Sequence, residues 1–366
     1  MSSRSNPTSA SGAVSAAWRA ALRPPPPSLL LTHHHRSTFS ISAWSLSSSS
    51  FVRSTVLNQS VPTVVTLHHP SICVGSGDGW VAVSGLDLAG LMNPLTGEEI
   101  PFQFKFFPKK KKEKQMKLFK VVFAPNPTAS DFTAAVITGG ARVTYTINGN
   151  NGWIEVNCPC LDDEVDGIAD VVYREKCGEK MVYCLMRSGG THVLLLRHQK
   201  PATFQPLLDK PNTVFYPNAA FAPPYNTIRS HVKVKNLVLC DDGSFYQIWR
   251  SEDICTLALP LPGGGEYHVE EDQIFVLKYY PCRRPYWVEV KDLGGYSFFV
   301  GKNNVVALRV EDDGGMMMLR SNCVYWIKRF EDRAKVLDVK TGKSMQCFPD
   351  AKLHSAICWY NLRDTL

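Results

Sequence analysis

"GDGWVAVSGLDLAGLMNPLTGEEIPF", residues 77–102, contains a tight turn, two apolar runs, a second turn at Thr96-Gly97 and a short run ending near a proline. With the preceding "GS", it places glycines at alternate positions, Gly75, Gly77 and Gly79. A dinucleotide-binding loop has the spacing G-x-G-x-x-G and leads from a strand into a helix. Here the third glycine comes one residue early, and "WVAVS" has the composition of another strand. Asp78-Gly79 between apolar runs therefore predicts a hairpin turn.

The same arrangement returns near the other end of the chain. "SNCVYWIKRFEDRAKVLDVKTGKSMQCFP", residues 321–349, again has an aromatic residue, a Thr-Gly turn and a final proline. Trp80 and Gly97 are separated by 17 positions, and Trp326 and Gly342 by 16. A third, weaker copy, "DDGSFYQIWRSEDICTLALPLP", residues 241–262, has no Thr-Gly turn. Strands and tight hairpins at this period predict the blades of a β-propeller, and the similar first and last copies suit a ring that closes on itself.

The remaining sequence supports an all-β chain. From residue 71, most apolar runs are four to eight residues long, rich in Val, Ile, Tyr, Phe and Trp, and bounded by turn residues. At about 40–45 residues per blade, this length fills six or seven blades. We therefore predict an all-β propeller of six or seven blades over residues 71–362. It follows a mostly disordered, Ser- and Pro-rich arm over residues 1–70 that has one short helix.

Charge and hydropathy narrow the classes of partner. The net charge is +7, and residues 1–77 contain arginine but no Asp, Glu or Lys. That composition fits either an organellar transit peptide or a disordered N-terminus. "PKKKKEK", residues 108–114, is predicted to be a solvated hairpin loop, with a nuclear-localisation signal as the alternative. The rest is nearly balanced in charge and has no run of 18 apolar residues, so neither a nucleic-acid surface nor a membrane span is predicted.

The polar clusters predict no metal, cofactor or catalytic site. The eleven cysteines are scattered, and several lie in apolar runs, which predicts free thiols in a reducing, intracellular compartment. The spacing of Cys158, Cys160, Cys177 and Cys184 does not match zinc-binding pairs. The acidic segment with Asp162, Asp163, Glu164 and Asp166 lacks the ligand spacing of an EF-hand loop. There is no G-x-S-x-G motif or other catalytic arrangement, so we expect no enzyme.

Several runs resemble a known family. These are "VGSGDGWVAV…LMNPLTGEEIPF", "VEVKDLGGYSFFVGKNN", "SNCVYWI", "VLDVKTGKSMQCF" and "CWY". Together they resemble the plant F-box-associated β-propeller family, which is catalogued as domain of unknown function 295 after members that act in brassinosteroid signalling. The resemblance covers about residues 70–360, and its most specific part runs from Asp292 through Trp326 to Trp359. It implies a β-propeller that serves as the substrate receptor of a ubiquitin ligase.

Typical members of that family begin with an F-box. "AVSAAWRAALRPPPPSLLL", residues 13–31, is similar to the tail of its last helix and the proline-rich spacer that follows, with Val14, Trp18 and Arg19 as matching residues. Only twelve residues precede this stretch, so we expect an F-box truncated to its last helix, about residues 13–22. Binding to a Skp1-type adaptor is accordingly not predicted.

We therefore predict a non-catalytic, protein-binding propeller derived from an F-box protein and located in the nucleus or cytoplasm. The alternative is a propeller of unknown binding role in a chloroplast or mitochondrion, with a cleaved transit peptide. Most tryptophans are predicted to lie in the core between blades. The candidate partner-binding residues come from "CRRPYW", residues 282–287, because Arg, Tyr and Trp dominate protein interfaces. They are Arg283, Arg284, Tyr286 and Trp287.

Overall fold

The architecture below comes from a computed structural model of the chain. The structure describes residues 28–35, 38–45, 50–57, 73–84, 89–94, 96–103, 118–139, 142–149, 152–158, 167–197, 202–207, 217–251, 256–261, 263–301, 305–310, 319–327, 334–347 and 354–360. The predicted F-box remnant, the basic segment 108–114 and the acidic segment 161–166 lie outside these ranges.

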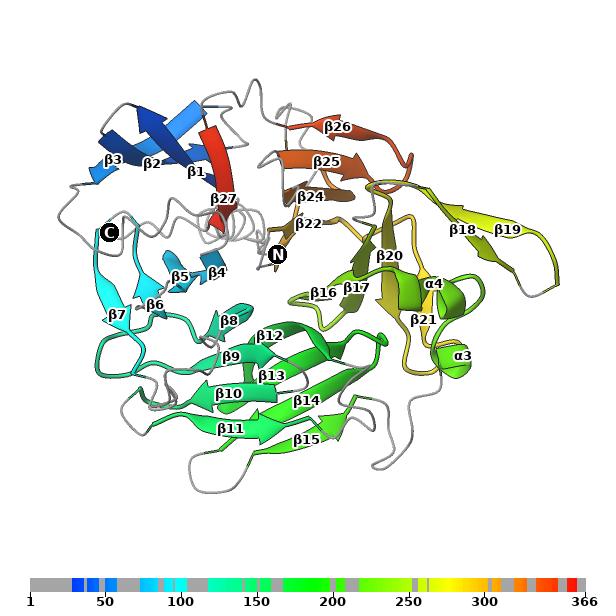
Figure 1. The fold of residues 1–366 in the computed structure, drawn as a ribbon, viewed down its shortest axis with the longest axis horizontal. Helices are drawn as coiled ribbons and strands as arrows, with labels where there is room; N and C mark the ends of the chain where they lie inside the picture. The colour runs from blue at the N-terminus through cyan, green and yellow to red at the C-terminus, as the bar shows by residue number, and fades with distance from the viewer. Residues whose placement is uncertain are drawn as a thin grey trace, which may run out of the picture.

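The described residues form a β-propeller whose sheets are arranged around a common centre (Figure 1). Five sheets are four-stranded antiparallel blades. The first four, with their strand bounds, are β4 (Cys73–Gly77), β5 (Trp80–Ser84), β6 (Ala89–Met92) and β7 (Glu99–Pro101); β8 (Lys120–Phe123), β9 (Ala134–Gly139), β10 (Arg142–Thr146) and β11 (Ile154–Asn157); β12 (Ile168–Lys176), β13 (Glu179–Met186), β14 (Thr191–Leu196) and β15 (Thr203–Pro206); and β16 (Val234–Leu239), β17 (Phe245–Arg250), β20 (Ile274–Tyr279) and β21 (Trp287–Glu289).

The fifth four-stranded blade joins the two ends of the chain. It consists of β1 (Ser28–His35), β2 (Thr38–Ser45), β3 (Ser50–Leu57) and β27 (His354–Tyr360), in the order β27-β1-β2-β3. In Figure 1 the red β27 lies directly beside the blue β1. The prediction that the ring closes on itself is therefore confirmed. Residues 28–57 were predicted to belong to the N-terminal arm, but the structure describes three strands there.

The last large sheet has a different plan. Its order is β23-β22-β24-β25-β26, and β22 runs parallel to β24. The bounds are β22 (Tyr296–Val300), β23 (Val305–Arg309), β24 (Cys323–Ile327), β25 (Ala334–Asp338) and β26 (Ser344–Gln346). The prediction of six or seven blades was therefore wrong: the described residues form five regular blades. A count from chain length assumes equal blades, whereas here this wider sheet and several insertions take up part of the length.

Two insertions lie beside the β16–β21 blade. A ribbon of β18 (Leu257–Pro260) and β19 (Glu266–Val269) projects from it, as Figure 1 shows. The weak third repeat was predicted to continue as a blade, but β18 leaves the sheet and pairs with β19 alone among the described residues. The helices α3 (Pro217–Ala220) and α4 (Tyr225–His231) precede the blade. They were not predicted, because four and seven residues are too short to show helical periodicity.

The "GSGDGW" stretch forms the predicted hairpin. Gly77 pairs with Trp80, and Asp78 (φ 47°) and Gly79 (φ 82°) are both left-handed, as a tight turn of this kind requires. Gly75 has another reason to lack a side chain: a Cβ there would lie 2.0 Å from the carbonyl oxygen of Val121 on β8. The stretch therefore turns the chain and lets two blades approach closely.

The two Thr-Gly turns are equivalent in detail, which confirms the repeat between the first and last copies. Gly97 donates its N–H to the carbonyl of Asn93 (2.9 Å), and Gly342 donates to the carbonyl of Asp338 (2.8 Å). The threonine of each turn also donates its N–H to the side chain of that Asn or Asp, at 3.2 Å and 2.9 Å. Both glycines have positive φ. The sequence similarity therefore records one hairpin geometry used at both places.

A buried carboxylate joins the inner strands of three blades. Asp170 on β12 forms an ion pair with Lys120 on β8, and both side chains are almost fully buried. Its other oxygen accepts the backbone N–H of Leu237 on β16 (2.8 Å), and the first oxygen also accepts that of Val171 (2.9 Å). Neighbouring inner strands contact one another here. Removing one member would strand a buried charge, which costs far more than the pair itself contributes.

We expect Asp170→Asn to lower the free energy of unfolding by about 3–5 kcal/mol, because an amide cannot neutralise the buried Lys120 ammonium. Urea denaturation followed by tryptophan fluorescence measures the change. Asp272→Asn is the matched control, since Asp272 contacts Lys335 at 3.0 Å in a partly exposed pair, and should cost under about 1 kcal/mol. Equal losses in the two variants would contradict a special role for Asp170.

Candidate functional site

The loop of residues 280–286, between β20 and β21, carries three of the four predicted partner-binding residues. Its ends are fixed by a hydrogen bond from the Tyr280 N–H to the Tyr286 carbonyl (2.8 Å). Inside the loop, Arg283 donates its N–H to the Tyr280 carbonyl (3.2 Å). Pro281 and Pro285 restrict the backbone further, because a proline ring fixes φ. The loop is thus held in place by local chemistry before any partner binds.

The two arginines of this loop are exposed and rest on different rings. The Arg283 guanidinium carbon lies 5.1 Å from the centre of the Tyr280 ring, and that of Arg284 lies 5.8 Å from the Tyr286 ring. Cation–π contacts of this kind orient a guanidinium and leave its N–H donors available. Among the described residues no carboxylate forms an ion pair with either arginine. We call residues 280–286 the arginine–tyrosine loop.

A row of partly exposed aromatic residues continues from this loop to the neighbouring blade. Tyr286 stacks on Tyr279 (ring centres 6.3 Å apart, planes 29° apart). Tyr279 meets Phe245 edge-on at 6.3 Å, and Phe245 lies 5.2 Å from Tyr183 on β13. We call these four residues the aromatic strip. It crosses from the β16–β21 blade to the β12–β15 blade and is a non-local feature, because it joins residues more than a hundred positions apart.

Trp287 does not belong to the surface. Its side chain is only 2% exposed, lies 5.2 Å from the Tyr279 ring, and packs in the core cluster that includes Phe221. Its place among the exposed partner-binding residues is therefore corrected: as the first residue of β21 it points into the core and supports the aromatic strip from beneath. The prediction that tryptophans lie mainly in the core is confirmed for the set Trp80, Trp153, Trp249, Trp287, Trp326 and Trp359.

Residues of and beside the two short helices fill the core beneath the aromatic strip. Phe221, which follows α3, is fully buried against Trp249 (ring centres 5.0 Å apart). It also fills the space over Gly189, where a Cβ would come within 2.7 Å of the Phe221 ring. Ile228 of α4 and Leu185 of β13 belong to the same cluster. The helices therefore fill the space between two blades, and sequence reasoning missed them.

Charged groups beside the loop are already engaged. The Lys278 ammonium lies 5.2 Å from the Tyr246 ring and 5.9 Å from the Tyr280 ring. Burial alone would lower the pKa of Lys278, but the Tyr246 hydroxyl and nearby Tyr280 and Asp242 outweigh it and raise the pKa. Asp242 also accepts hydrogen bonds from the backbone and hydroxyl of Ser244. The two loop arginines are thus the cations that these neighbours leave open to a partner.

Other titratable groups nearby are held in their protonated forms. Burial, reinforced by the two neighbouring aspartates, raises the pKa of the Cys240 thiol to about 12. Burial and the Asp241 carboxylate, which accepts a hydrogen bond from the Tyr296 hydroxyl, raise the pKa of Tyr296. Burial also raises the pKa of Tyr183. Groups of this kind do not act as nucleophiles or bases near neutral pH.

Four cysteines that lie in apolar runs of the sequence are buried: Cys73, Cys184, Cys240 and Cys323. Of the four cysteines weighed as zinc ligands, Cys158 and Cys184 are buried, Cys177 is exposed in a turn, and Cys160 lies outside the described residues. No group of three His, Cys, Asp or Glu side chains in the described part of the chain could hold a metal ion. In the same residues no helix is long and apolar enough to cross a membrane.

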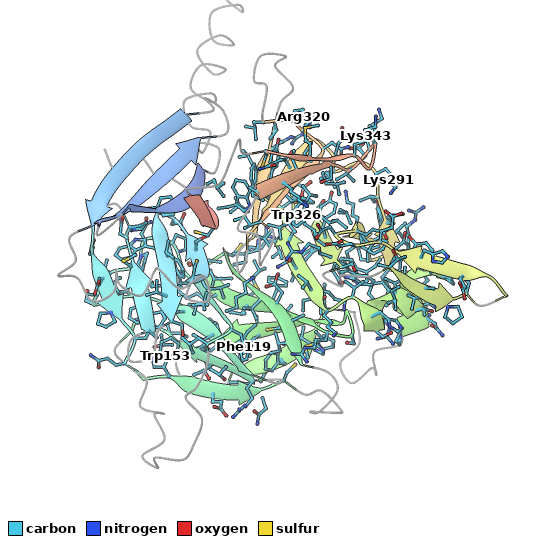
Figure 2. The ribbon with its side chains drawn as sticks, turned by 45° about the horizontal axis from the view of Figure 1, so that its top comes forward. Phe119, Trp153, Lys291, Arg320, Trp326 and Lys343 are labelled. Atoms are coloured by element: carbon cyan, nitrogen blue, oxygen red, sulfur yellow. The ribbon has the colours of Figure 1, made fainter. Side chains whose placement is uncertain are left out.

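A second basic region lies beside the five-stranded sheet, outside its strands. Figure 2 shows Lys291, Arg320 and Lys343 gathered at one edge of the molecule, away from Phe119 and Trp153. Lys291 contacts Glu289 at 3.1 Å, and an Arg320 guanidinium nitrogen lies 3.6 Å from the sulfur of Met345. The described ring contacts of the aromatic strip do not include Lys291, Arg320 or Lys343. It is therefore the weaker candidate and a useful reference surface.

Comparison with known families identifies the chain. A family model described as the KIB1-4 beta-propeller matches residues 45–361. The chain belongs to the KIB1-4 β-propeller family. Membership confirms the predicted resemblance as far as a β-propeller family is concerned, and it agrees with strands that begin before residue 71. A separate comparison with curated proteins found no match.

Three solved structures are distantly similar to this KIB1-4 propeller. The β-propeller domain of Myceliophteria thermophila Cps50 (Swd1) is 9% identical with a TM-score of 0.36, covering 88% of this chain and 96% of that one. A chain of the nidogen/laminin complex is 10% identical with a TM-score of 0.41 (90% and 95%), and the WD40 domain of SCAP from fission yeast is 8% identical with a TM-score of 0.31 (94% and 90%). Similarity this low carries no argument about function.

The KIB1-4 propeller should tolerate loss of both loop arginines. We expect the double variant Arg283→Ala/Arg284→Ala to change the free energy of unfolding by less than about 0.5 kcal/mol, because both side chains are exposed. Trp287→Ala should cost about 3–5 kcal/mol, because it empties a buried aromatic site. Urea denaturation of the three proteins measures both values. A large loss in the arginine variant would show that the loop is structural rather than available for binding.

Proposed function

We propose that this chain is a non-catalytic protein-binding module whose partner contacts the arginine–tyrosine loop and the aromatic strip. The observation that carries the proposal is the pair of exposed arginines, each resting on a tyrosine at one end of a continuous row of partly exposed aromatic rings. Arginine and tyrosine are over-represented among the residues that contribute most to protein association.

The geometry favours binding with little entropic cost. The loop is closed by the Tyr280–Tyr286 hydrogen bond, and the aromatic rings are supported by buried neighbours such as Trp287. Preorganised side chains lose less conformational freedom when a partner binds. The strip extends the surface to a second blade, which matters because a stable interface covers roughly 800 Å² on each partner. One loop alone would be too small.

The absence of enzyme activity is part of the proposal. Burial raises the pKa values of Tyr183 and Tyr246 in and beside the strip, so both hydroxyls stay protonated near neutral pH. The Cys240 thiol has its pKa raised to about 12 and is buried beneath the surface. The arrangement supplies hydrogen-bond donors, rings and positive charge, which suit the binding of a partner.

Site-specific cross-linking tests the proposed surface. The full chain is expressed in cells of the organism that makes it, with the photo-cross-linking residue p-benzoylphenylalanine in place of Tyr286. In the matched control it replaces exposed Lys343 instead. We expect discrete cross-linked protein adducts from position 286 and none of the same adducts from position 343. Adding Arg283→Ala/Arg284→Ala should reduce those adducts at least about tenfold, as loss of interface hot spots does.

Two results would contradict this assignment. One is an identical set of adducts from positions 286 and 343, which would indicate non-specific capture. The other is cross-linking from position 286 that does not change when both arginines are removed. A stable, folded arginine variant is required for either comparison, and circular dichroism of the purified proteins provides that check.

We further propose that the module is related to the substrate receptors of ubiquitin ligases. This rests on membership of the KIB1-4 family and on the similarity of residues 13–31 to an F-box tail; Val14, Trp18 and Arg19 lie outside the described residues. We expect no co-purification of this chain with a Skp1-type adaptor, because its resemblance to an F-box covers only the tail of the last helix and the spacer, residues 13–31. Tight, stoichiometric binding of the adaptor would refute that expectation.

A further inference from the structure

Each of the two loop arginines rests on its own tyrosine ring. Arg283 rests on Tyr280, where the chain enters the loop, and Arg284 rests on Tyr286, where it leaves. Two guanidinium groups, each oriented by its own ring, can bind two carboxylates, each of which accepts paired N–H donors.

Nearby carboxylates disfavour an extended polyanion as the ligand of the two arginines. Asp241 and Asp242 lie in the β16–β17 turn beside Tyr296 and Lys278. Glu289 ends β21, and Asp292 follows it in the chain. Extended polyanions such as nucleic acids need a broad basic surface, and these carboxylates would repel a phosphate backbone. Two carboxylates on a short segment bring less negative charge to this acidic flank than an extended phosphate backbone does.

The aromatic strip specifies what should accompany the charges. Tyr279, Phe245 and Tyr183 continue away from Tyr286 as a half-exposed apolar surface. Such a surface gains most from covering by an apolar or aromatic side chain, which it can contact edge-on or by stacking. Charge and shape therefore point to a peptide segment in which acidic residues lie next to an apolar residue.

We infer that the partner binds through a short acidic segment with two carboxylates, one for Arg283 and one for Arg284, next to an aromatic or large aliphatic side chain that covers the aromatic strip. This inference rests on the proposed function and names the chemistry of the partner. The arginines supply specificity for the acidic pair, and the strip supplies the apolar contact.

Selection from a library of random dodecapeptides tests the inference without knowledge of the partner. The full chain is immobilised, bound peptides are sequenced, and the selection is repeated with Arg283→Ala/Arg284→Ala. Lys340→Ala/Lys343→Ala is the matched control, since it also removes two exposed positive charges. We expect enrichment of paired acidic residues beside an aromatic or aliphatic residue with the unmodified chain and with the lysine variant, and loss of that motif with the arginine variant.

Fluorescence anisotropy then measures the affinities of one enriched peptide and its derivatives. We expect at least about tenfold weaker binding when both acids become amides or both arginines become alanine, and less than about twofold change in the lysine variant. Binding should also weaken as salt rises from about 50 to 200 mM.

Three results would overturn the inference: no acidic motif in the selection, equal loss in the arginine and lysine variants, or tighter binding of a monophosphoserine peptide or single-stranded DNA than of the acidic peptide. If cross-linking from position 286 still captures a protein in an arginine-dependent way, the proposed function survives and only the acidic-segment inference fails. If that cross-linking fails as well, both are wrong.

Discussion

The buried carboxylate of Asp170 is the interaction on which the arrangement of the inner strands depends. A charge inside a protein is tolerated only when it is paired and its lone pairs accept hydrogen bonds. Here the partners come from three different inner strands: the Lys120 ammonium from β8, a neighbouring N–H on β12 itself, and the Leu237 N–H from β16. Because all three must be in place together, this contact fixes the mutual position of three blades. Apolar packing alone would allow more variation.

The candidate binding surface follows from how the next pair of blades is filled. Phe221 and the helices α3 and α4 occupy the space between the β12–β15 and β16–β21 blades, and Gly189 makes room for the Phe221 ring. Trp249 and Trp287 complete that core. Aromatic residues at its outer margin stay partly exposed and form the strip. Core and binding surface are thus continuous, and the same packing that stabilises the interblade space also orients the surface rings.

Prediction from sequence succeeded where the determining contacts are local. The Asp78-Gly79 hairpin and the two Thr-Gly turns depend on φ angles and hydrogen bonds within six residues, so the local sequence predicts them. It failed where burial decides the role of a residue. Asp170 follows an acidic stretch and looks like a solvated charge, yet it is buried. Trp287 follows two exposed arginines and looks like part of their surface, yet it packs in the core.

The sequence by itself determined the all-β class, the propeller repeat, the hairpin turns and the loop that bears Arg283, Arg284 and Tyr286, because strand alternation and turn chemistry act over a few residues. Only the tertiary structure decided that five blades are regular, that strands near both ends share one blade, and that Tyr183, Phe245, Tyr279 and Tyr286 form one row. Those outcomes depend on which blades are neighbours in the folded ring. Side-chain contacts between distant strands are set by packing of the whole ring, for which a single sequence carries no local signal.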